Sequence, residues 1–530
     1  MIREKIQILW FKKNLRVEDN EILANLNPSI PTLAVYFFED DILKSPDYSW
    51  FHTKFIMDSL EDLKKSLKKL SIHLLTLENT LPTWFENIRK YYDITHIYSH
   101  EETGNNISYR RDVRVLDWCK SWAINIVEYP TNGVVRKLES RDTWSKIWYE
   151  RMLSDIFIPQ KIESKLSLPE ELIEISEQVY KKYKKESGDF QYLQKWWEIA
   201  GKKVLKDFLT KRGQSYMFHI SKPYESILSC SRLSPYITYG CLSVKTIFQT
   251  TRLRIAELEQ VPSNSAKNFK KSLDFFLARL HWQSHFIQKL EDEPSLEWKN
   301  LNPEFNSIRN TEDTLLLDSI FRAQSGIPYI DATIRQLQKT GWCNFRSRAI
   351  LISFLCNTCM QPWQSVWARL AQLFLDYEPG IHYSQIQMQA GTSGINTIRI
   401  YNPTLNGKEK DSEGNFIKTF LPELLGIPDE YLYEPWKYER FDEIDYPKPI
   451  IDVESANRSA RKILWEIKWN TSKETKQKIY QKHGSRAFRA KRQTSQRMQN
   501  KDTRKNSLSE TISKIQKIRR WDALLQTSLF

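Results

Sequence analysis

The chain has no apolar run that approaches the roughly 20 residues of a membrane-spanning helix. Its first residues, MIREKIQILWFKK, hold only a short apolar stretch before charges follow, so we expect no signal peptide. Cysteine is scarce as well: six cysteines in 530 residues show no disulfide spacing, which is typical of a reducing compartment. We therefore expect a cytoplasmic protein without membrane contact, and we expect it to be a monomer.

A metal-binding motif is also missing. Cys356 and Cys359 come nearest to one, but they stand alone in the apolar stretch AILISFLCNTCM. Two ligands cannot close a tetrahedral site, so we interpret them as two core cysteines on one helix and expect no metal.

Glycine-rich phosphate loops are absent from the first 130 residues. This region alternates helical patterns such as FIMDSLEDLKKSLKKL with five strand-length segments, IQILWF, TLAVYFF, SIHLLTL, ITHIYSH and INIVEY. The alternation predicts βαβ units around a parallel sheet. Neither G-x-G-x-x-G nor G-x-x-x-x-G-K-[ST] follows any of these segments, which argues against a dinucleotide held by a glycine-rich loop and against a P-loop nucleotide.

The remainder of the chain is predicted to be helical. A charged stretch with few core residues predicts a connector, and long amphipathic segments such as KKSLDFFLARLHWQSHFIQKL follow it. We predict a Rossmann-like α/β domain over residues 1–132, a connector over 133–205, an all-helical domain over 206–454 and a basic extension over 455–530.

The positive charge is concentrated in that extension. The whole chain carries +14, and residues 455–530 hold 20 Lys and Arg against 5 Asp and Glu. Such a segment can neutralise phosphates and release counterions, which favours a nucleic acid partner. A solvated tail without a partner explains the charge equally well.

Two stretches of the helical half carry polar groups that suit a bound ligand. CSRLSP offers Ser231 and Ser234 at a predicted helix start, which can hold phosphate, although a serine there is first of all an N-cap. FFLARLHWQSHF places Arg279 and Trp282 within one helical turn, where a buried tryptophan is the simpler interpretation. Since the chain has 18 tryptophans, several can line a site.

A buried ion pair is predicted between TGWCNFRSRA and LDYEPG. Arg346 and Arg348 point to different helix faces, so at least one can face inward, where it needs a carboxylate. Asp376 and Glu378 lie about thirty residues later. An arginine paired with Asp376 beside a polar, aromatic pocket suits a planar cofactor with hydrogen-bonding groups.

Four ordered blocks resemble the cryptochrome and DNA photolyase family, over roughly residues 5 to 450. They are LWFKKNLRVEDN (9–20), CSRLSPYITYGCLS (230–243), SGIPYIDATIRQLQKTGWCNFRSRA (325–349) and IRIYNPTLNGKEKDSEGNFIKTFLPEL (398–424). The resemblance implies an antenna-type α/β domain, a helical domain that holds FAD, and blue-light-driven electron transfer from reduced flavin. It is compatible with an antenna pigment in the first domain, whose type no motif specifies.

The resemblance also implies roles for single residues. The block that holds the FAD phosphates corresponds to Ser231, Arg232, Leu233 and Ser234, and Cys230 replaces its first hydroxyl. Arg348 and Asp376 correspond to the pair beside the flavin ring, and Tyr377, Glu378 and His382 follow as cofactor-binding positions. Trp282 corresponds to the tryptophan that packs on a flipped pyrimidine dimer, which makes Trp282, Arg279 and Asn344 the candidate catalytic residues.

Several positions depart from the family pattern. Arg279 stands where repair enzymes for cyclobutane dimers carry Glu, and Asn344 and Phe345 replace their His-Asn. The pair of histidines of (6-4) enzymes is missing, and no cysteine follows Cys359 to bind the iron–sulfur cluster of one branch.

The stretch HYSQIQMQA (382–390) alternates like a strand, but the family places a helix there that starts a tryptophan chain. Ile386 and Met388 replace those tryptophans, and only the middle position is kept, as Trp363. Trp363 is therefore the candidate electron-transfer residue, and electrons would take another route, through Tyr383, Tyr377 or Trp367, or move slowly.

Three functions compete. The first is a DNA photolyase, a lyase that splits UV-induced pyrimidine dimers with light and reduced FAD, and the basic extension favours it. The second is a cryptochrome-like photoreceptor without repair activity, which Arg279, Asn344 and Phe345 favour. The third is a flavoprotein that binds nucleic acid without photochemistry.

Overall fold

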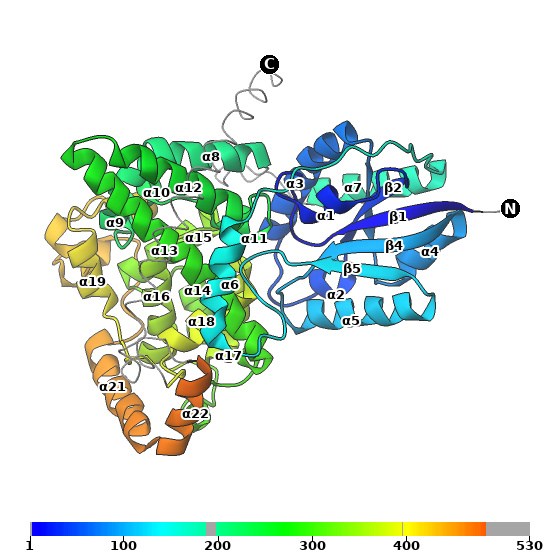
Figure 1. Ribbon diagram of the computed structural model, residues 1–530. Coiled ribbons are helices and arrows are strands. Elements are labelled where there is room, and N and C mark those ends of the chain that lie inside the picture. The colour runs from blue at the N-terminus through cyan, green and yellow to red at the C-terminus, as the bar shows by residue number, and fades with distance from the viewer. Residues whose placement is uncertain (1–2, 187–197, 395, 484–530) are drawn as a thin grey trace.

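A five-stranded sheet and a helical half lie side by side in the computed structural model, which describes residues 3–186, 198–394 and 396–483 (Figure 1). No helix in these ranges combines the length and the apolar composition that crossing a membrane requires.

All five predicted strands are present and parallel, in the order β3-β2-β1-β4-β5. Leu9 pairs with Ala34 on one side and with Tyr98 on the other. The central strands read as nearly continuous apolar runs because helices cover both faces of the sheet. The strands are β1 (Glu4–Phe11), β2 (Thr32–Phe38), β3 (His73–Glu78), β4 (Tyr92–His100) and β5 (Asn125–Tyr129).

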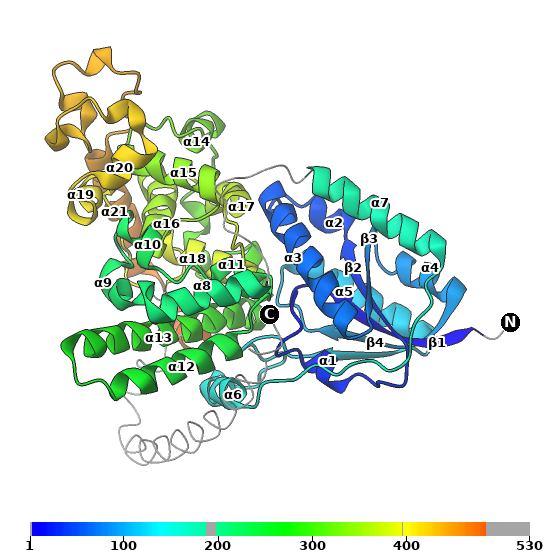
Figure 2. The same ribbon diagram turned by 90° about the horizontal axis from the view of Figure 1, so that it is seen from above.

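The helices over the sheet form two layers. Side chains of α1 (Glu21–Asn25), α3 (Trp50–Lys69) and α7 (Glu170–Glu186) share one core with one face of the sheet, and Figure 2 shows α3 and α7 side by side. On the other face, α4 (Thr83–Tyr91) and α5 (Asn106–Ser121) pack. A short helix, α2 (Asp40–Leu43), follows β2.

The region predicted as a connector is packed into both halves. Its α7 buries Val179 and Tyr183 beside the sheet. Its α6 (Arg141–Leu153) buries Trp144 and Trp148 in the same core, which continues into the helical half. The charge that marks this region in the sequence therefore lies on the outer faces of amphipathic helices.

The helical half contains no strand among its described residues, as predicted. Its helices are α8 (Glu198–Thr210), α9 (Tyr216–His219), α10 (Glu225–Ser229), α11 (Ser234–Thr238), α12 (Val244–Glu259), α13 (Asn264–Asp292), α14 (Thr314–Phe321), α15 (Pro328–Thr340), α16 (Phe345–Ser353), α17 (Trp363–Leu373), α18 (Pro379–Gln389), α19 (Pro403–Lys410), α20 (Asn415–Phe420), α21 (Val453–Asn470) and α22 (Lys473–His483). A π-helical turn, η4 (Phe354–Thr358), follows α16.

The stretch HYSQIQMQA is helical: it forms most of α18, which packs along α13. Its strand-like alternation is a coincidence of sequence.

The two halves meet closely at Gly240. The amide of Leu15 donates to the carbonyl of Tyr239 at 3.0 Å. Gly240 has φ +66°, and a Cβ there would lie 2.4 Å from the backbone of Asn14. A side chain would therefore push the halves apart, and glycine also suits the left-handed backbone.

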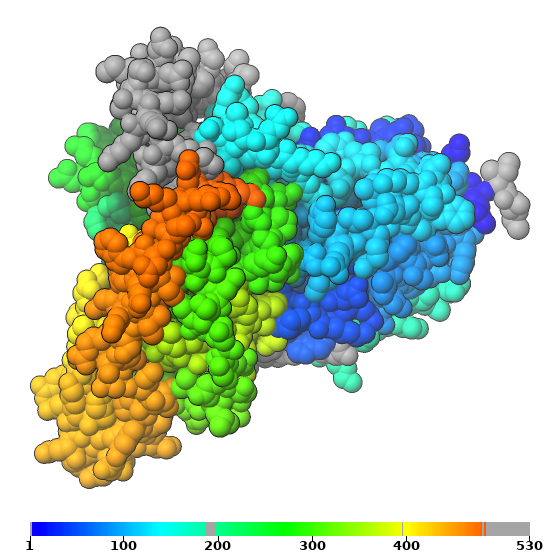
Figure 3. All heavy atoms as spheres, turned by 90° about the horizontal axis from the view of Figure 1, so that it is seen from below, coloured from blue at the N-terminus to red at the C-terminus, as the bar shows by residue number. Residues whose placement is uncertain are grey.

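The start of the basic extension is part of the fold. Leu464 of α21 is fully buried against Phe305 and Ile398, and the hydroxyl of Thr358 donates to Asn457 at 2.7 Å. Figure 3 shows α21 and α22, in orange, lying against the green part of the helical half. Residues 484–530 lie outside the described ranges.

Candidate functional site

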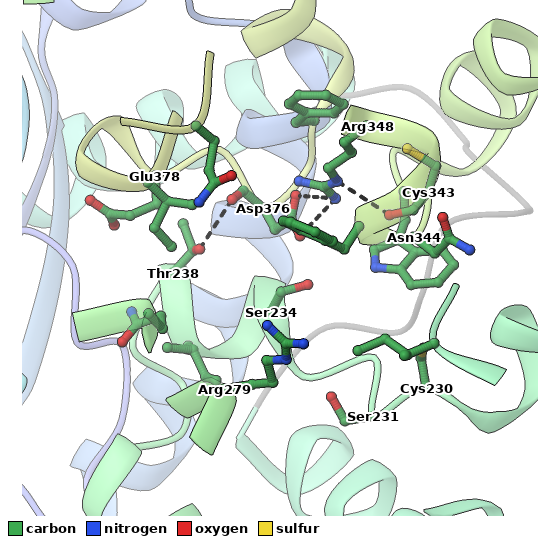
Figure 4. Close-up of a pocket in the computed structure, with 18 of the residues that line it drawn as sticks. Cys230, Ser231, Ser234, Thr238, Arg279, Cys343, Asn344, Arg348, Asp376 and Glu378 are labelled. Carbon is green, nitrogen blue, oxygen red and sulfur yellow. Dashed lines mark hydrogen bonds and ion pairs between the residues drawn. The ribbon is translucent and has the colours of Figure 1, made fainter. Parts of the chain in front are cut away.

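A cavity of about 290 Å³ lies among α11, α13, α16 and α18 (Figure 4). Ten of the thirteen predicted site residues line it: Ser231, Arg232, Ser234, Arg279, Asn344, Arg348, Asp376, Tyr377, Glu378 and His382. The helical half thus brings together residues from four separate stretches of sequence.

The predicted buried ion pair is Arg348 with Asp376. One terminal nitrogen of Arg348 lies 2.9 Å and 3.0 Å from the two carboxylate oxygens, and its Nε donates to the carbonyl of Cys343 at 3.2 Å. Burial disfavours the charged guanidinium, but Asp376 and Cys343 together more than offset this, so the pKa of Arg348 lies above its usual value. The guanidinium also lies over the ring of Phe374, 4.3 Å from its centre.

The CSRLSP stretch turns sharply at the cavity. Arg232 has φ +59°, a left-handed conformation that is rare for arginine, and its guanidinium lies 4.0 Å from the ring centre of Trp342. Burial lowers its pKa to about 10. The N-cap of α11 is Leu233, which makes no side-chain cap bond. The interpretation of the serines as N-caps is therefore wrong, and both hydroxyls line the cavity.

Leu233 itself does not line the cavity. Its side chain is fully buried in the core shared with the sheet, where an apolar group gains most from leaving water. Only its backbone is available to the predicted role in cofactor binding.

Asn344 lines the cavity, but it is mainly a helix cap. Its Oδ1 accepts from the amide of Ser347 at 2.7 Å, and its Nδ2 donates to Ser226 at 3.1 Å. One N–H of the Asn344 amide therefore remains for the predicted catalytic role.

Arg279 enters the cavity from α13. Its guanidinium lies 4.5 Å from the ring centre of Phe275, and its buried Nε has no hydrogen-bond partner among the described residues. A buried N–H without a partner is costly, so this group is suited to receive a ligand.

The structure does not place Trp282 in the cavity. Its side chain is 45% exposed and contacts the rings of His285 and Phe286. Arg279 and Gln283 of the same helix line the cavity, whereas Trp282 is not among its lining residues, and its catalytic role stays a prediction.

Glu378 joins the site to the sheet domain. It forms an ion pair at 3.2 Å with Lys13, which follows β1. Its Oε1 is buried without a hydrogen-bond partner. Burial raises the pKa of Glu378, and Lys13 offsets this only in part.

His382 is buried against α17. Its Nε2 donates to the carbonyl of Trp367 at 2.9 Å, since a carbonyl can only accept, so Nδ1 carries no proton in the neutral ring. Burial lowers the pKa of His382 to about 4.

This pKa predicts acid sensitivity. Between pH 6.5 and pH 4 the unfolded chain binds a proton at His382 and the folded protein does not, so the free energy of unfolding falls as the pH falls, by up to about 3 kcal/mol. His382→Gln keeps a donor for Trp367 and should flatten this dependence. Urea unfolding of FAD-loaded protein at several pH values measures this pH dependence of the free energy of unfolding. His73→Gln, at an exposed position, serves as control; equal slopes for both variants would contradict the prediction.

Aromatic rings connect α17 to the cavity. Trp363 is buried, lies outside the cavity lining and faces Tyr383, whose ring centre is 6.4 Å away. Tyr383 lies 5.5 Å from Trp367, and His382 lies 5.1 Å from Tyr377. The geometry is compatible with the alternative electron route, which stays a prediction.

Sequence reasoning missed several lining residues. Gln385 and Gln389 follow His382 by three and seven positions and share its helix face. The helical period would have found them once HYSQIQMQA was interpreted as a helix. Tyr216 and Phe374 also line the cavity, and no local signal identifies them.

The donor set fits a flat, anionic cofactor. Three arginines, two serine hydroxyls and the aromatic rings of Trp342 and Phe374 line one cavity, and the buried Arg279 Nε and Glu378 Oε1 lack partners there. No group of three His, Cys, Asp or Glu in the described ranges could hold a metal ion.

Comparison with known families decides which cofactor this is. Residues 7–143 match the family described as DNA photolyase, and residues 276–466 match the family described as FAD binding domain of DNA photolyase. The chain belongs to the cryptochrome and DNA photolyase family. Its cofactor is FAD, and the second match extends into α21.

Relatives within the family carry different names. A deoxyribodipyrimidine photo-lyase of Alkalihalophilus pseudofirmus is 29% identical over 278 residues, 50% of this chain and 55% of that protein. A (6-4)DNA photolyase of Arabidopsis thaliana is 24% identical over 87% of this chain and 88% of its own length. Cryptochrome-2 of Gallus gallus is 24% identical over 85% of this chain and 81% of its own length.

Solved structures of the family share the fold. A bacterial class III photolyase from Agrobacterium tumefaciens aligns with TM-score 0.74 and 20% identity over 89% of this chain and 99% of that one. An archaeal photolyase from Sulfolobus tokodaii, described with two FAD molecules and a novel light-harvesting cofactor, aligns with TM-score 0.70 and 20% identity over 87% and 99%.

Proposed function

We propose that this family member is a light-dependent DNA photolyase, a lyase that repairs UV-induced pyrimidine dimers. The observation that carries the proposal is that the FAD cavity reaches the surface: Phe345, which lines it, is 43% exposed, and Arg279 and Gln283 stand in the same wall. A pyrimidine dimer, two adjacent bases of one strand, can therefore approach the cofactor when it is turned out of the duplex.

The residues of the chain have distinct tasks in this proposal. Arg348 and Asp376 hold the flavin ring, while Ser231, Ser234 and Arg232 receive its phosphates. Bound in its reduced form, FAD would supply one electron under blue light and regain it after the dimer splits, so the reaction would have no net redox change. Arg279 donates hydrogen bonds to the carbonyl oxygens of the flipped pyrimidines and stabilises negative charge on them.

A cryptochrome-like photoreceptor is the second candidate. Two observations favour the photoreceptor. Arg279 replaces the family's Glu, and Asn344 serves as a helix cap. Photolyases and a cryptochrome match this chain at similar identity, so similarity does not favour one over the other.

A repair assay distinguishes the two. FAD-loaded, reduced protein is mixed with UV-damaged single- and double-stranded DNA under blue light, and dimers are counted. We expect dimers to disappear only in the light, and Arg279→Ala to slow this about tenfold or more, the effect of one lost charged donor. Trp122→Ala, at an exposed position of the sheet domain, is the control. Unchanged dimer levels in both DNA forms would leave the photoreceptor as the function.

An antenna pigment has a place in this proposal as well. A second cavity of about 130 Å³ lies at the carboxyl ends of the strands, beside Tyr36, Tyr48 and Tyr239. Ligands of open parallel sheets bind at this edge. We propose that an antenna pigment, if the protein carries one, binds there.

A further inference from the structure

A third cavity, of about 250 Å³, lies on the far side of α18 from the FAD cavity. Trp298, Lys299, Asn300, Asn306, Arg309 and Trp363 line it, and it shares no lining residue with the FAD cavity. Gln387 of α18 holds the backbone beside this lining: its side-chain oxygen accepts from the amide of Leu301 at 2.7 Å, and its nitrogen donates to the carbonyl of Lys299 at 2.8 Å.

Arg309 gives this cavity its charge. Two of its nitrogens donate to the carbonyl of Ala390 at 3.0 Å and to Asn357 Oδ1 at 2.6 Å, and its buried Nε has no hydrogen-bond partner in the part of the chain that the structure describes. Burial lowers its pKa, and within the described ranges no carboxylate opposes this effect. A partly buried guanidinium whose described acceptors are all neutral has no counter-ion among the described residues.

The rest of the lining matches an anion with a flat ring. No acidic residue lines the cavity, and Lys299 adds a second positive charge. Trp298 is 48% exposed, so its indole can stack on an incoming ring. Trp363 is fixed by a hydrogen bond from its Nε1 to Asn300 Oδ1 at 2.7 Å, and Asn300 in turn donates to Asn306 at 2.8 Å.

We propose that this cavity binds a small aromatic anion of mononucleotide size, whose phosphate or carboxylate pairs with Arg309 and Lys299 and whose ring stacks on Trp298. At about 250 Å³ the cavity is smaller than the FAD cavity, at about 290 Å³, so a ligand smaller than FAD suits it. Arginine suits this task because its planar fork matches phosphate and carboxylate oxygens.

Isothermal titration of FAD-saturated protein tests the proposal, because saturation keeps the probe out of the FAD cavity. AMP is the probe, with adenosine and inorganic phosphate as separate arms. We expect one AMP to bind per chain, and adenosine and phosphate each to bind at least about tenfold more weakly. Trp298→Ala and Lys299→Gln should each weaken AMP binding by about tenfold.

The control variant is Trp122→Ala, which removes a tryptophan of nearly the same exposure, 49%, from the sheet domain. Arg309→Gln should abolish AMP binding. If the FAD content or the thermal unfolding of this variant shows misfolding, the results for Trp298→Ala and Lys299→Gln decide. No saturable binding of AMP, equal binding of AMP and adenosine, phosphate binding as tight as AMP binding, or an unchanged affinity in Trp298→Ala would each overturn the proposal.

Discussion

Arg348→Ala is expected to yield colourless protein. The guanidinium lies against both oxygens of Asp376 in the wall of the FAD cavity, and the Asp376 side chain is only 5% exposed. The variant leaves this carboxylate buried without its cation, and breaking a buried pair costs about 3–5 kcal/mol. A negative charge without a partner would then face the flavin ring.

This cost is expected to lower FAD affinity by a factor of about 100 or more. The absorbance of purified protein near the flavin bands, divided by the protein absorbance, measures the FAD content. Arg348→Lys restores the charge but not the contact with both carboxylate oxygens. We therefore expect an FAD content between that of Arg348→Ala and that of the parent protein.

Arg346→Ala is the matched control. Arg346 lies two residues away on the same helix and donates to the hydroxyl of Tyr401 at 2.8 Å, outside the cavity. It should keep stoichiometric FAD. If Arg348→Ala also keeps stoichiometric FAD, the assignment of Arg348 and Asp376 to the flavin is wrong.

Removal of residues 484–530 is expected to weaken DNA binding and its dependence on salt. This segment carries 12 Lys and Arg against 3 Asp and Glu. Each phosphate contact contributes about 0.9 to the slope of log affinity against log salt, so six lost contacts would reduce the slope by about 5. Binding of undamaged duplex DNA between low and high salt measures the slope.

The position of the cut follows from the structure. A cut at Ser455, where the basic extension starts in the sequence, would remove α21, whose Leu464 is fully buried and whose Asn457 bonds Thr358. A cut after His483 keeps α21, α22 and the ion pair between Lys482 and Glu293.

A full-length variant with the 12 Lys and Arg of 484–530 replaced by Gln separates charge from chain length. It should show the same reduced slope as the truncated protein. An unchanged slope in both would mean that the charge of this segment is only solvated surface and that the helical half alone binds DNA.

Local sequence patterns were sufficient for the elements of this fold. The strands were predictable above all at the centre of the sheet, where β1 and β2 are covered on both faces and are therefore nearly continuous apolar runs. The pair of Arg348 and Asp376 was predictable because a buried guanidinium needs a carboxylate, and few carboxylates are available near it.

The sequence by itself therefore determined the elements, the family, the FAD site and the uneven charge. Only the tertiary structure decided which side of each element meets the cavity. Trp282 points to solvent and Leu233 into the core, although both belong to the predicted motifs. Lys13 reaches Glu378 across 365 positions, and Arg309 lies in a cavity that no motif marks. The physical reason is that helical periodicity defines faces, whereas the packing of distant helices determines what covers each face.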